Sequence, residues 1–235
     1  MRVLAAFSLF LVATAARAQS LSVLPVNVFL SPGQSATTVT VTNSGQSDTA
    51  IQIRAYGWSQ KDGTDQLGKS DELLLSPPLA KIPAGASQVI RLVLRQKPQN
   101  QEATYRILID QIPPPSEPGV VHFVLRLSIP VFALPPVRCV PDVQFRLESN
   151  DGQFYLVATN AGKMHEAVRE MQLTGEDGRE VKLESNPLSY VLPGATRRWH
   201  IVAPDSSSPK IEALRLKARM NAGVIDQQVR IVAVR

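Results

Sequence analysis

Residues 37–45 read Thr-Thr-Val-Thr-Val-Thr-Asn-Ser-Gly, and this stretch decides the class of fold. Its β-branched side chains alternate with a period of two, which is typical of a half-buried strand, and an Asn-Ser-Gly turn ends it. The same order of strand and asparagine turn recurs at Ala158-Thr159-Asn160-Ala161-Gly162. Both halves of the chain therefore carry a β signature.

Short apolar or alternating segments surround the first stretch, separated by turn sequences such as Pro83-Ala84-Gly85 and Pro113-Pro114-Pro115. About seven strands are expected in this half, at residues 21–30, 37–42, 51–56, 73–75, 89–94, 105–109 and 121–129. Seven short strands with regular turns predict an immunoglobulin-like β-sandwich.

A second β block follows Leu134-Pro135-Pro136-Val137, which has the composition of an interdomain linker. Its strands are expected at residues 143–147, 154–159, 167–173, 181–183, 196–202, 214–220 and 229–234. Residues 165–172 could instead form one or two helical turns, but a strand is favoured because helix-forming stretches are almost absent elsewhere. The sequence predicts two tandem all-β immunoglobulin-like domains, at residues 19–134 and 135–235.

The first eighteen residues have the pattern of an export signal. Met1-Arg2 is followed by an apolar run from Val3 to Ala13, and Ala16-Arg17-Ala18 predicts cleavage before Gln19. This run is too short to span a bilayer, and no later stretch approaches that length. Cleavage lowers the formal charge from +5 to +3, and no Lys/Arg cluster stands out, so nucleic-acid binding is not expected.

Motifs of common enzyme classes are absent from the sequence. It contains no Gly-x-Ser-x-Gly, His-Glu-x-x-His, phosphate-loop or Gly-x-Gly-x-x-Gly pattern. The three histidines lie in different segments without metal-ligand spacing: they are His122, His165 and His200. The sequence therefore predicts a protein that is not an enzyme and that needs neither a cofactor nor a metal.

Two weaker features have simple interpretations. Asp62 and Asp65, around Gly63, could form a carboxylate pair or a calcium loop, but acidic glycine-containing hairpin tips are usually solvated turns. Cys139 is the single cysteine, so it forms no internal disulfide; it is expected to be a buried thiol rather than a reactive one.

The most unusual segment is the run from Val121 to Ile129. Five apolar side chains (Val121, Phe123, Leu125, Leu127, Ile129) share one face over roughly 27 Å, at about 3.3 Å per residue. An ordinary core-facing strand would explain the pattern. The run also follows a Pro-rich loop and leads into the linker, and a strand at a sheet edge invites pairing with another chain.

Short motifs along nearly the whole mature chain resemble the periplasmic chaperones of the chaperone–usher pilus pathway. Their order and spacing carry the resemblance more than any one of them does. They are Leu30-Ser31-Pro32-Gly33, Val39-Thr40-Val41-Thr42-Asn43, Trp58-Ser59-Gln60, Ser76-Pro77-Pro78, Ile82-Pro83-Ala84-Gly85, Gln88-Val89-Ile90-Arg91-Leu92, Gln111-Ile112-Pro113-Pro114 and Ile129-Pro130-Val131-Phe132.

The resemblance implies a boomerang of two sandwiches that holds pilin subunits in the periplasm without ATP and passes them to an outer-membrane usher. In that family the last strand of the first domain is lent to a pilin that lacks its own final strand. That strand matches the amphipathic run, so Val121, Phe123 and Leu125 would be inserted. Leu127 would be a fourth, or the first residue to return to the chaperone's own core. Self-association of the free protein would mask this strand.

One departure makes the chain resemble the archaic, non-classical branch of the family. Classical members hold the pilin's terminal carboxylate with an arginine on the first strand and a lysine on the last strand of domain one. Those positions correspond to Asn27 and Pro130, so both cations are absent.

Hairpin geometry suggests a substitute anchor. Antiparallel pairing of residues 105–109 with residues 121–129, centred near Glu117, would place Arg106 opposite Ser128 at the linker end. A guanidinium there would bind a carboxylate in a bidentate manner. Arg106 is therefore the expected anchor and Arg91 the second choice, while an exposed arginine at a strand start is the simpler alternative.

Two other functions stay open from the residues alone. An exported structural or adhesive surface protein could be built from the same sandwiches. A secreted hydrolase on a β-sandwich is the third reading, and the missing motifs argue against it.

Overall fold

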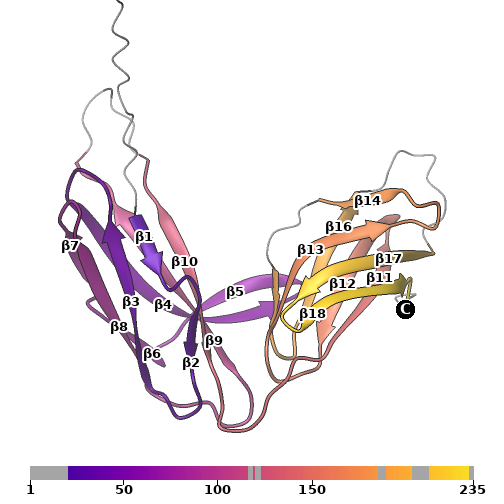
Figure 1. Cartoon of the computed structure of the whole chain (residues 1–235), viewed down its shortest axis with the longest axis horizontal. Coiled ribbons are helices and arrows are strands. Elements are labelled where there is room, and N and C mark those ends of the chain that lie inside the picture. Colours follow the sequence, from indigo (N-terminus) through magenta and orange to yellow (C-terminus); the bar gives the residue numbers. More distant parts are fainter. Residues whose placement is uncertain (1–20, 116–118, 120–122, 185–188, 203–211, 233–235) are drawn as a thin grey trace, which may run out of the picture.

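The computed structural model describes residues 21–115, 119, 123–184, 189–202 and 212–232. This part of the chain is all β, with eighteen strands and no helix, arranged as two sandwiches that form the arms of an open V (Figure 1). The prediction of two tandem immunoglobulin-like sandwiches is confirmed. Residues 165–172 belong to a strand, as favoured, and not to a helix.

The first sandwich contains ten strands in two sheets. The outer sheet has the order β1-β3-β8-β6, and the other, which faces the second sandwich, has the order β2-β10-β9-β4-β5, with β7 also paired to β4 (Figure 1). The strands are β1 (Leu21–Leu24), β2 (Val28–Leu30), β3 (Ala36–Asn43), β4 (Thr49–Lys61), β5 (Thr64–Lys69), β6 (Leu73–Ser76), β7 (Leu79–Ile82), β8 (Ser87–Leu94), β9 (Ala103–Ile112) and β10 (Arg126–Ala133).

The second sandwich is an eight-stranded sheet that folds around one core. Its order is β11-β12-β16-β14-β13-β17-β18, and β15 pairs with β13. The strands are β11 (Val143–Asn150), β12 (Gln153–Asn160), β13 (Glu166–Thr174), β14 (Glu180–Leu183), β15 (Ser189–Val191), β16 (Thr196–Val202), β17 (Ala213–Met220) and β18 (Gly223–Arg230).

The segment predicted as one strand over residues 21–30 is two strands, which corrects the prediction. β1 pairs antiparallel with β3 in the outer sheet, whereas β2 pairs parallel with β10 in the other. Pro25 follows β1 directly and has no N–H to donate, so the ladder ends there and the chain crosses between sheets. The crossing brings Asn27 to the edge of the sheet that faces the second sandwich.

In each sandwich a buried asparagine at the end of a strand forms hydrogen bonds with the backbone around it, as the repeated strand-and-turn sequence suggests. The fully buried Asn43 donates from Nδ2 to the Ser47 and Ile82 carbonyls at 2.8 and 3.1 Å. Asn160 donates in the same way to the Met164 and Val191 carbonyls at 2.8 and 2.9 Å. Each Oδ1 accepts from the backbone N–H two residues on.

The Asn43→Ala variant should lose about 2 kcal/mol of folding stability, because it leaves buried carbonyls and an N–H without partners. Urea denaturation would measure the loss. Asn160→Ala should cost the second sandwich a similar amount, and the exposed Asn150→Ala should change nothing measurable. A variant at Asn43 as stable as the native chain would contradict the assigned role.

Candidate binding site: the donor segment and the interdomain contact

The part of the amphipathic run that the structure describes begins at Phe123, and Val121 lies outside the described residues. We call residues 123–125 the donor segment. Its side chains are open to solvent: Phe123 is 91% exposed, Val124 51% and Leu125 42%. A phenylalanine this exposed has no packing role in the chain itself, so the segment is available for another molecule.

The donor segment is not itself a strand, because β10 begins only at Arg126. This corrects the prediction of a continuous strand over residues 121–129. The physical reason is that β9 ends at Ile112, where Pro113-Pro114-Pro115 cannot continue the ladder. A strand without a neighbour has no hydrogen bonds to define it.

One edge of β10 is unpaired where it follows the donor segment. β9 pairs with the whole of β10 on one side, but β2 pairs on the other side only with Val131, Phe132 and Ala133. Within the described ranges no strand pairs with that edge of β10 from Arg126 to Pro130. The backbone N–H and C=O groups that point to this edge, apart from the missing N–H of Pro130, are therefore free to accept an added strand.

The base of the donor segment is fixed by polar contacts. The Gln111 backbone N–H donates to the Leu125 carbonyl at 2.9 Å, and the Gln111 Oε1 accepts from the Leu125 N–H at 3.3 Å. Next to it, Asp110 pairs with both Arg126 and Arg54. Partial burial opposes ionisation of Asp110, yet hydrogen bonds from Arg126 and Arg54 hold its pKa below the usual value.

The apolar side chains after the donor segment turn into the first sandwich. Leu127 is partly buried and packs against its core, and Ile129 is 6% exposed. In the free chain, Leu127 therefore packs on the core of its own sandwich. The exposed apolar side chains of this run are thus those before Arg126.

Arg106 lies on β9 opposite Pro130, and not opposite Ser128 as predicted. Ser128 faces Leu108 instead, so the true register is displaced by two residues. The centre of the hairpin could not be located from a proline-rich connection. Because side chains alternate with a period of two, this displacement leaves Arg106 on the expected face of the sheet.

Arg106, Pro130 and Asn27 form one cross-strand row. Pro130 lies opposite Arg106, and the parallel register of Val131 with Val28 brings Asn27 beside Pro130. The row therefore places the Arg106 guanidinium next to the two positions, Asn27 and Pro130, at which the resemblance led us to expect cations.

The Arg106 guanidinium adjoins aromatic rings of both sandwiches. Its carbon is 3.7 Å from the Trp58 ring centroid and 5.7 Å from that of Tyr190 on the second sandwich. Burial lowers its pKa, and the negative charge of Asp65 opposes that shift. No carboxylate of the described residues lies within ion-pair distance of it. A stacked, partly desolvated cation without a partner is a good binding site for an anion.

Arg91, the second choice, is not brought to this site. It lies on β8 in the outer sheet, opposite Thr38 and Ser76, and its side chain is exposed. The structure thus separates the two candidate anchors onto different sheets, and only Arg106 adjoins the second sandwich.

A buried cluster joins the two sandwiches, and sequence reasoning missed most of its members. Phe132 of the first sandwich stacks on His165 of the second with ring centroids 3.6 Å apart. His165 Nδ1 lies 2.6 Å from Glu102 Oε1, and its backbone N–H donates to Glu102 Oε2 at 2.9 Å. Both side chains are almost fully buried.

The aromatic part of this cluster touches the anchor row. Tyr190 packs edge-on against Trp58, and its hydroxyl donates to Asn27 Oδ1 at 3.1 Å. Trp58 and Phe132 lie in motifs that carried the family resemblance, but nothing in the sequence paired them with Tyr190 or His165. A lone histidine and a lone tyrosine give no signal of a contact formed between domains.

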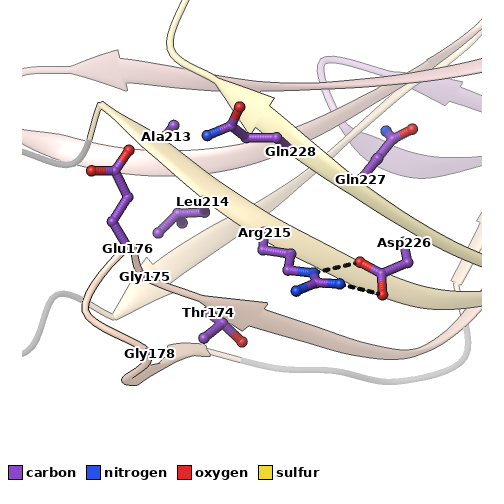
Figure 2. A pocket seen from close by; sticks show the side chains of 10 residues that line it. All are labelled: Thr174, Gly175, Glu176, Gly178, Ala213, Leu214, Arg215, Asp226, Gln227 and Gln228. Carbon is purple, nitrogen blue, oxygen red and sulfur yellow. Dashed lines mark hydrogen bonds and ion pairs between the residues drawn. The ribbon is translucent and has the colours of Figure 1, made fainter.

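A depression on the second sandwich is lined by Arg215 and Asp226, which pair at 2.7 and 3.0 Å, and by Glu176 (Figure 2). Among the described residues no three His, Cys, Asp or Glu side chains form a group that could hold a metal ion. In the same part of the chain, no helix has the length and hydropathy to cross a membrane.

The structure also shows the surroundings of Cys139 and of the acidic hairpin tip. Cys139 is half-buried next to the linker rather than buried as predicted, with its thiol 3.8 Å from the Asn100 carbonyl. The tip around Asp62 and Asp65 is not a plain solvated turn, which corrects the prediction: Asp65 forms an ion pair with Arg197 of the second sandwich at 2.8 Å.

Comparison with known proteins agrees with this geometry. The family model of the pili and flagellar-assembly chaperone, PapD N-terminal domain, matches residues 20–137, a range that contains the first sandwich, the donor segment and Arg106. The chain is 28% identical over 158 residues to the chaperone protein FimB/FhaD of Bordetella pertussis, covering 59% of this chain and 62% of the relative. It is 35% identical over 94 residues to the probable fimbrial chaperone EcpB of Escherichia coli, covering 39% of this chain and 42% of the relative.

Matches to these curated relatives span only about two fifths to three fifths of their length. Solved structures share the fold over almost the whole chain. The CsuC–CsuE chaperone–tip adhesion subunit complex of archaic Csu pili of Acinetobacter baumannii aligns with 92% of this chain and all of that chain, at 22% identity and a TM-score of 0.69. The Salmonella enterica complex of SafA pilin with the SafB chaperone aligns with 93% of this chain and 98% of that chain, at 16% identity and a TM-score of 0.61.

A chaperone role is not catalytic, which agrees with the absence of enzyme motifs from the sequence. Three observations agree: the family model matches half of the chain, two sandwiches form the arms of a V, and an exposed apolar segment lies beside an open strand edge. The chain belongs to the family of pili and flagellar-assembly chaperones.

Proposed function

We propose that this protein is a periplasmic chaperone that captures pilin-type subunits by donor-strand complementation and delivers them to an outer-membrane usher without ATP. The observation that carries the proposal is the 91% exposed Phe123, three residues before β10, a strand with one free edge. A subunit that lacks a strand exposes an apolar groove and two unpaired strand edges. Adding residues 121–125 as a strand would cover both.

The energetics favour this role. Burying Val121, Phe123 and Leu125 would each contribute about 1.5–3 kcal/mol before the segment's ordering cost, and the added ladder supplies backbone hydrogen bonds. Leu127 stays with the chaperone's core in the free chain. The fold of the archaic Csu chaperone and the loss of both classical cations, at Asn27 and Pro130, support placement in the archaic, non-classical branch.

The proposed organisation is a signal peptide at residues 1–18, a donor domain at residues 19–134 and a second domain at residues 135–235. A periplasmic pull-down of the tagged protein, followed by mass spectrometry, tests the proposal. We expect a stoichiometric small β-rich subunit to co-purify. If nothing co-purifies while the pilin operon is expressed, the role of a surface protein would replace that of a chaperone.

We further propose that Arg106 holds the terminal carboxylate of the subunit. Arg106→Ala should weaken capture about 10–100-fold, because a charge-assisted bidentate contact contributes about 1.5–3 kcal/mol. Binding of the co-purified subunit to immobilised chaperone would measure it. Arg91→Ala is the matched control, as an exposed arginine on the other sheet, and it should bind normally. Normal capture by Arg106→Ala, or loss only in Arg91→Ala, would refute the assignment.

A further inference from the structure

The β4–β5 hairpin leaves the first sandwich and reaches the second. Figure 1 shows β5 crossing the space between the two arms of the V. Its ladder runs from the pair Tyr56 and Lys69 to the pair Lys61 and Thr64, with Gly63 at the tip. Such a projection has no core of its own to cover, so its contacts with the second sandwich are what hold it.

Gln60 contacts the second sandwich through both ends of its side-chain amide. Nε2 donates to the Tyr190 carbonyl at 2.7 Å, and Oε1 accepts from the Leu192 N–H at 3.0 Å. The Gln60 amide thus bonds one carbonyl and one N–H of the second sandwich, as the backbone of a neighbouring strand would. The same Nε2 also donates to Asp65 Oδ1 at 2.8 Å, which ties the two strands of the hairpin together.

The tip adds an ionic and a backbone contact. Asp65 Oδ1 accepts from Arg197 Nη1 at 2.8 Å, and Gly63 pairs with Arg197 through the backbone. Gly63 has φ +80°, and a Cβ at this position would lie 3.2 Å from the Arg198 Cβ. Glycine therefore allows both the turn and the close approach.

These contacts form a second attachment, separate from the buried cluster at Phe132, Glu102 and His165. From Trp58 in that cluster to Gly63 the strand advances roughly 16 Å, at about 3.3 Å per residue. A single attachment lets two rigid bodies rotate about it. Two attachments separated along the interface remove most of that freedom and define one angle between the sandwiches.

The candidate anchor lies between the two attachments. Arg106 stacks on Trp58 of the same sheet, approaches Tyr190 of the second sandwich, and is attracted by Asp65 of the hairpin. Its surroundings thus come from both sandwiches and exist only at this angle. A change of angle would remove Tyr190 and Arg197 from the neighbourhood of the guanidinium.

We propose that the β4–β5 hairpin is a brace that fixes the angle between the sandwiches, and that Gln60 and Asp65 are positioning residues for Arg106. The second half of the inference rests on the proposed function, since it assumes that Arg106 binds the subunit carboxylate. The first half concerns the free protein and stands without it.

Spin-label distances in the free protein test the brace. Labels at Lys97→Cys and Lys217→Cys, both exposed, would report one distance between the sandwiches in a Cys139→Ser background. Gln60→Ala and Asp65→Asn should each broaden the distance distribution and displace it from the native mean. Gln66→Ala is the control, because its side chain bonds only Thr64 within the hairpin, and it should leave the distribution narrow. Native distributions in both brace variants would overturn the brace.

A double-mutant cycle tests the positioning role, with the co-purified subunit as probe. Gln60→Ala should weaken capture roughly tenfold, and it should have no further effect once Arg106 is alanine. If the two losses simply add, Gln60 does not act through Arg106 and that part of the inference fails. If the native chain captures no subunit, the proposed function fails, while the distance measurement still decides whether the brace exists.

Discussion

Phe123→Asp is expected to abolish subunit capture while the chaperone itself stays folded. At 91% exposure the Phe123 ring contributes almost nothing to the chain's own core, so its loss should not change stability. In the complex the ring would lie in an apolar groove. Losing its burial costs about 2–3 kcal/mol, and placing a carboxylate there costs several more, so affinity should fall more than 100-fold.

The control for this variant is Leu79→Asp. Leu79 is 56% exposed on β7, away from the donor segment, so the change tests whether any added charge on an apolar surface has the same effect. It should capture the subunit normally. Capture by Phe123→Asp at native affinity would show that the subunit binds elsewhere. Light scattering of the same variant also tests self-association, since association that uses the donor segment should be lost with the ring.

Glu102→Ala is expected to uncouple the two sandwiches. Glu102 is 3% exposed and accepts from the His165 backbone N–H and contacts its ring, so its removal leaves two buried polar groups without partners. Breaking a buried pair of this kind typically costs about 3–5 kcal/mol. This loss would fall on the contact between the sandwiches rather than on either core.

Calorimetry distinguishes this from ordinary destabilisation. The native chain should unfold in one transition, and Glu102→Ala should unfold in two, one for each sandwich. Glu102→Gln keeps an acceptor for the His165 N–H, so the separation between its two transitions should be smaller than in Glu102→Ala. Glu72→Ala is a suitable control, because Glu72 accepts from the Tyr105 hydroxyl within the first sandwich and takes no part in the contact. A single native-like transition for Glu102→Ala would mean that other contacts suffice for coupling.

Local patterns predicted most of the fold and half of the site. The alternation at residues 37–42, its recurrence before Asn160 and the proline-rich punctuation specified two β-sandwiches, because strand period and turn chemistry are properties of neighbours in the chain. The exposed apolar segment was also visible, as an amphipathic run placed after a proline-rich loop. The sequence placed Arg106 on the right face, since a two-residue error in register preserves the alternation.

Contacts between distant segments could not be predicted in this way. The pairing of Glu102 with His165, the stacking of Arg106 on Trp58 beside Tyr190 and the ion pair of Asp65 with Arg197 join residues 48 to 132 positions apart. No local pattern records such pairs. The start of β10 at Arg126 likewise depends on where its neighbour β9 ends.

The sequence alone determined that this chain is a two-sandwich β protein with an apolar segment available to a partner, because side-chain periodicity and turn residues act over a few positions. Only the tertiary structure decided where that segment is free and which cation lies at the contact between the sandwiches. It also decided that an apparently solvated hairpin spans the two domains. Those features depend on the register of paired strands and on the angle between two packed bodies, and both are set by packing across the whole molecule.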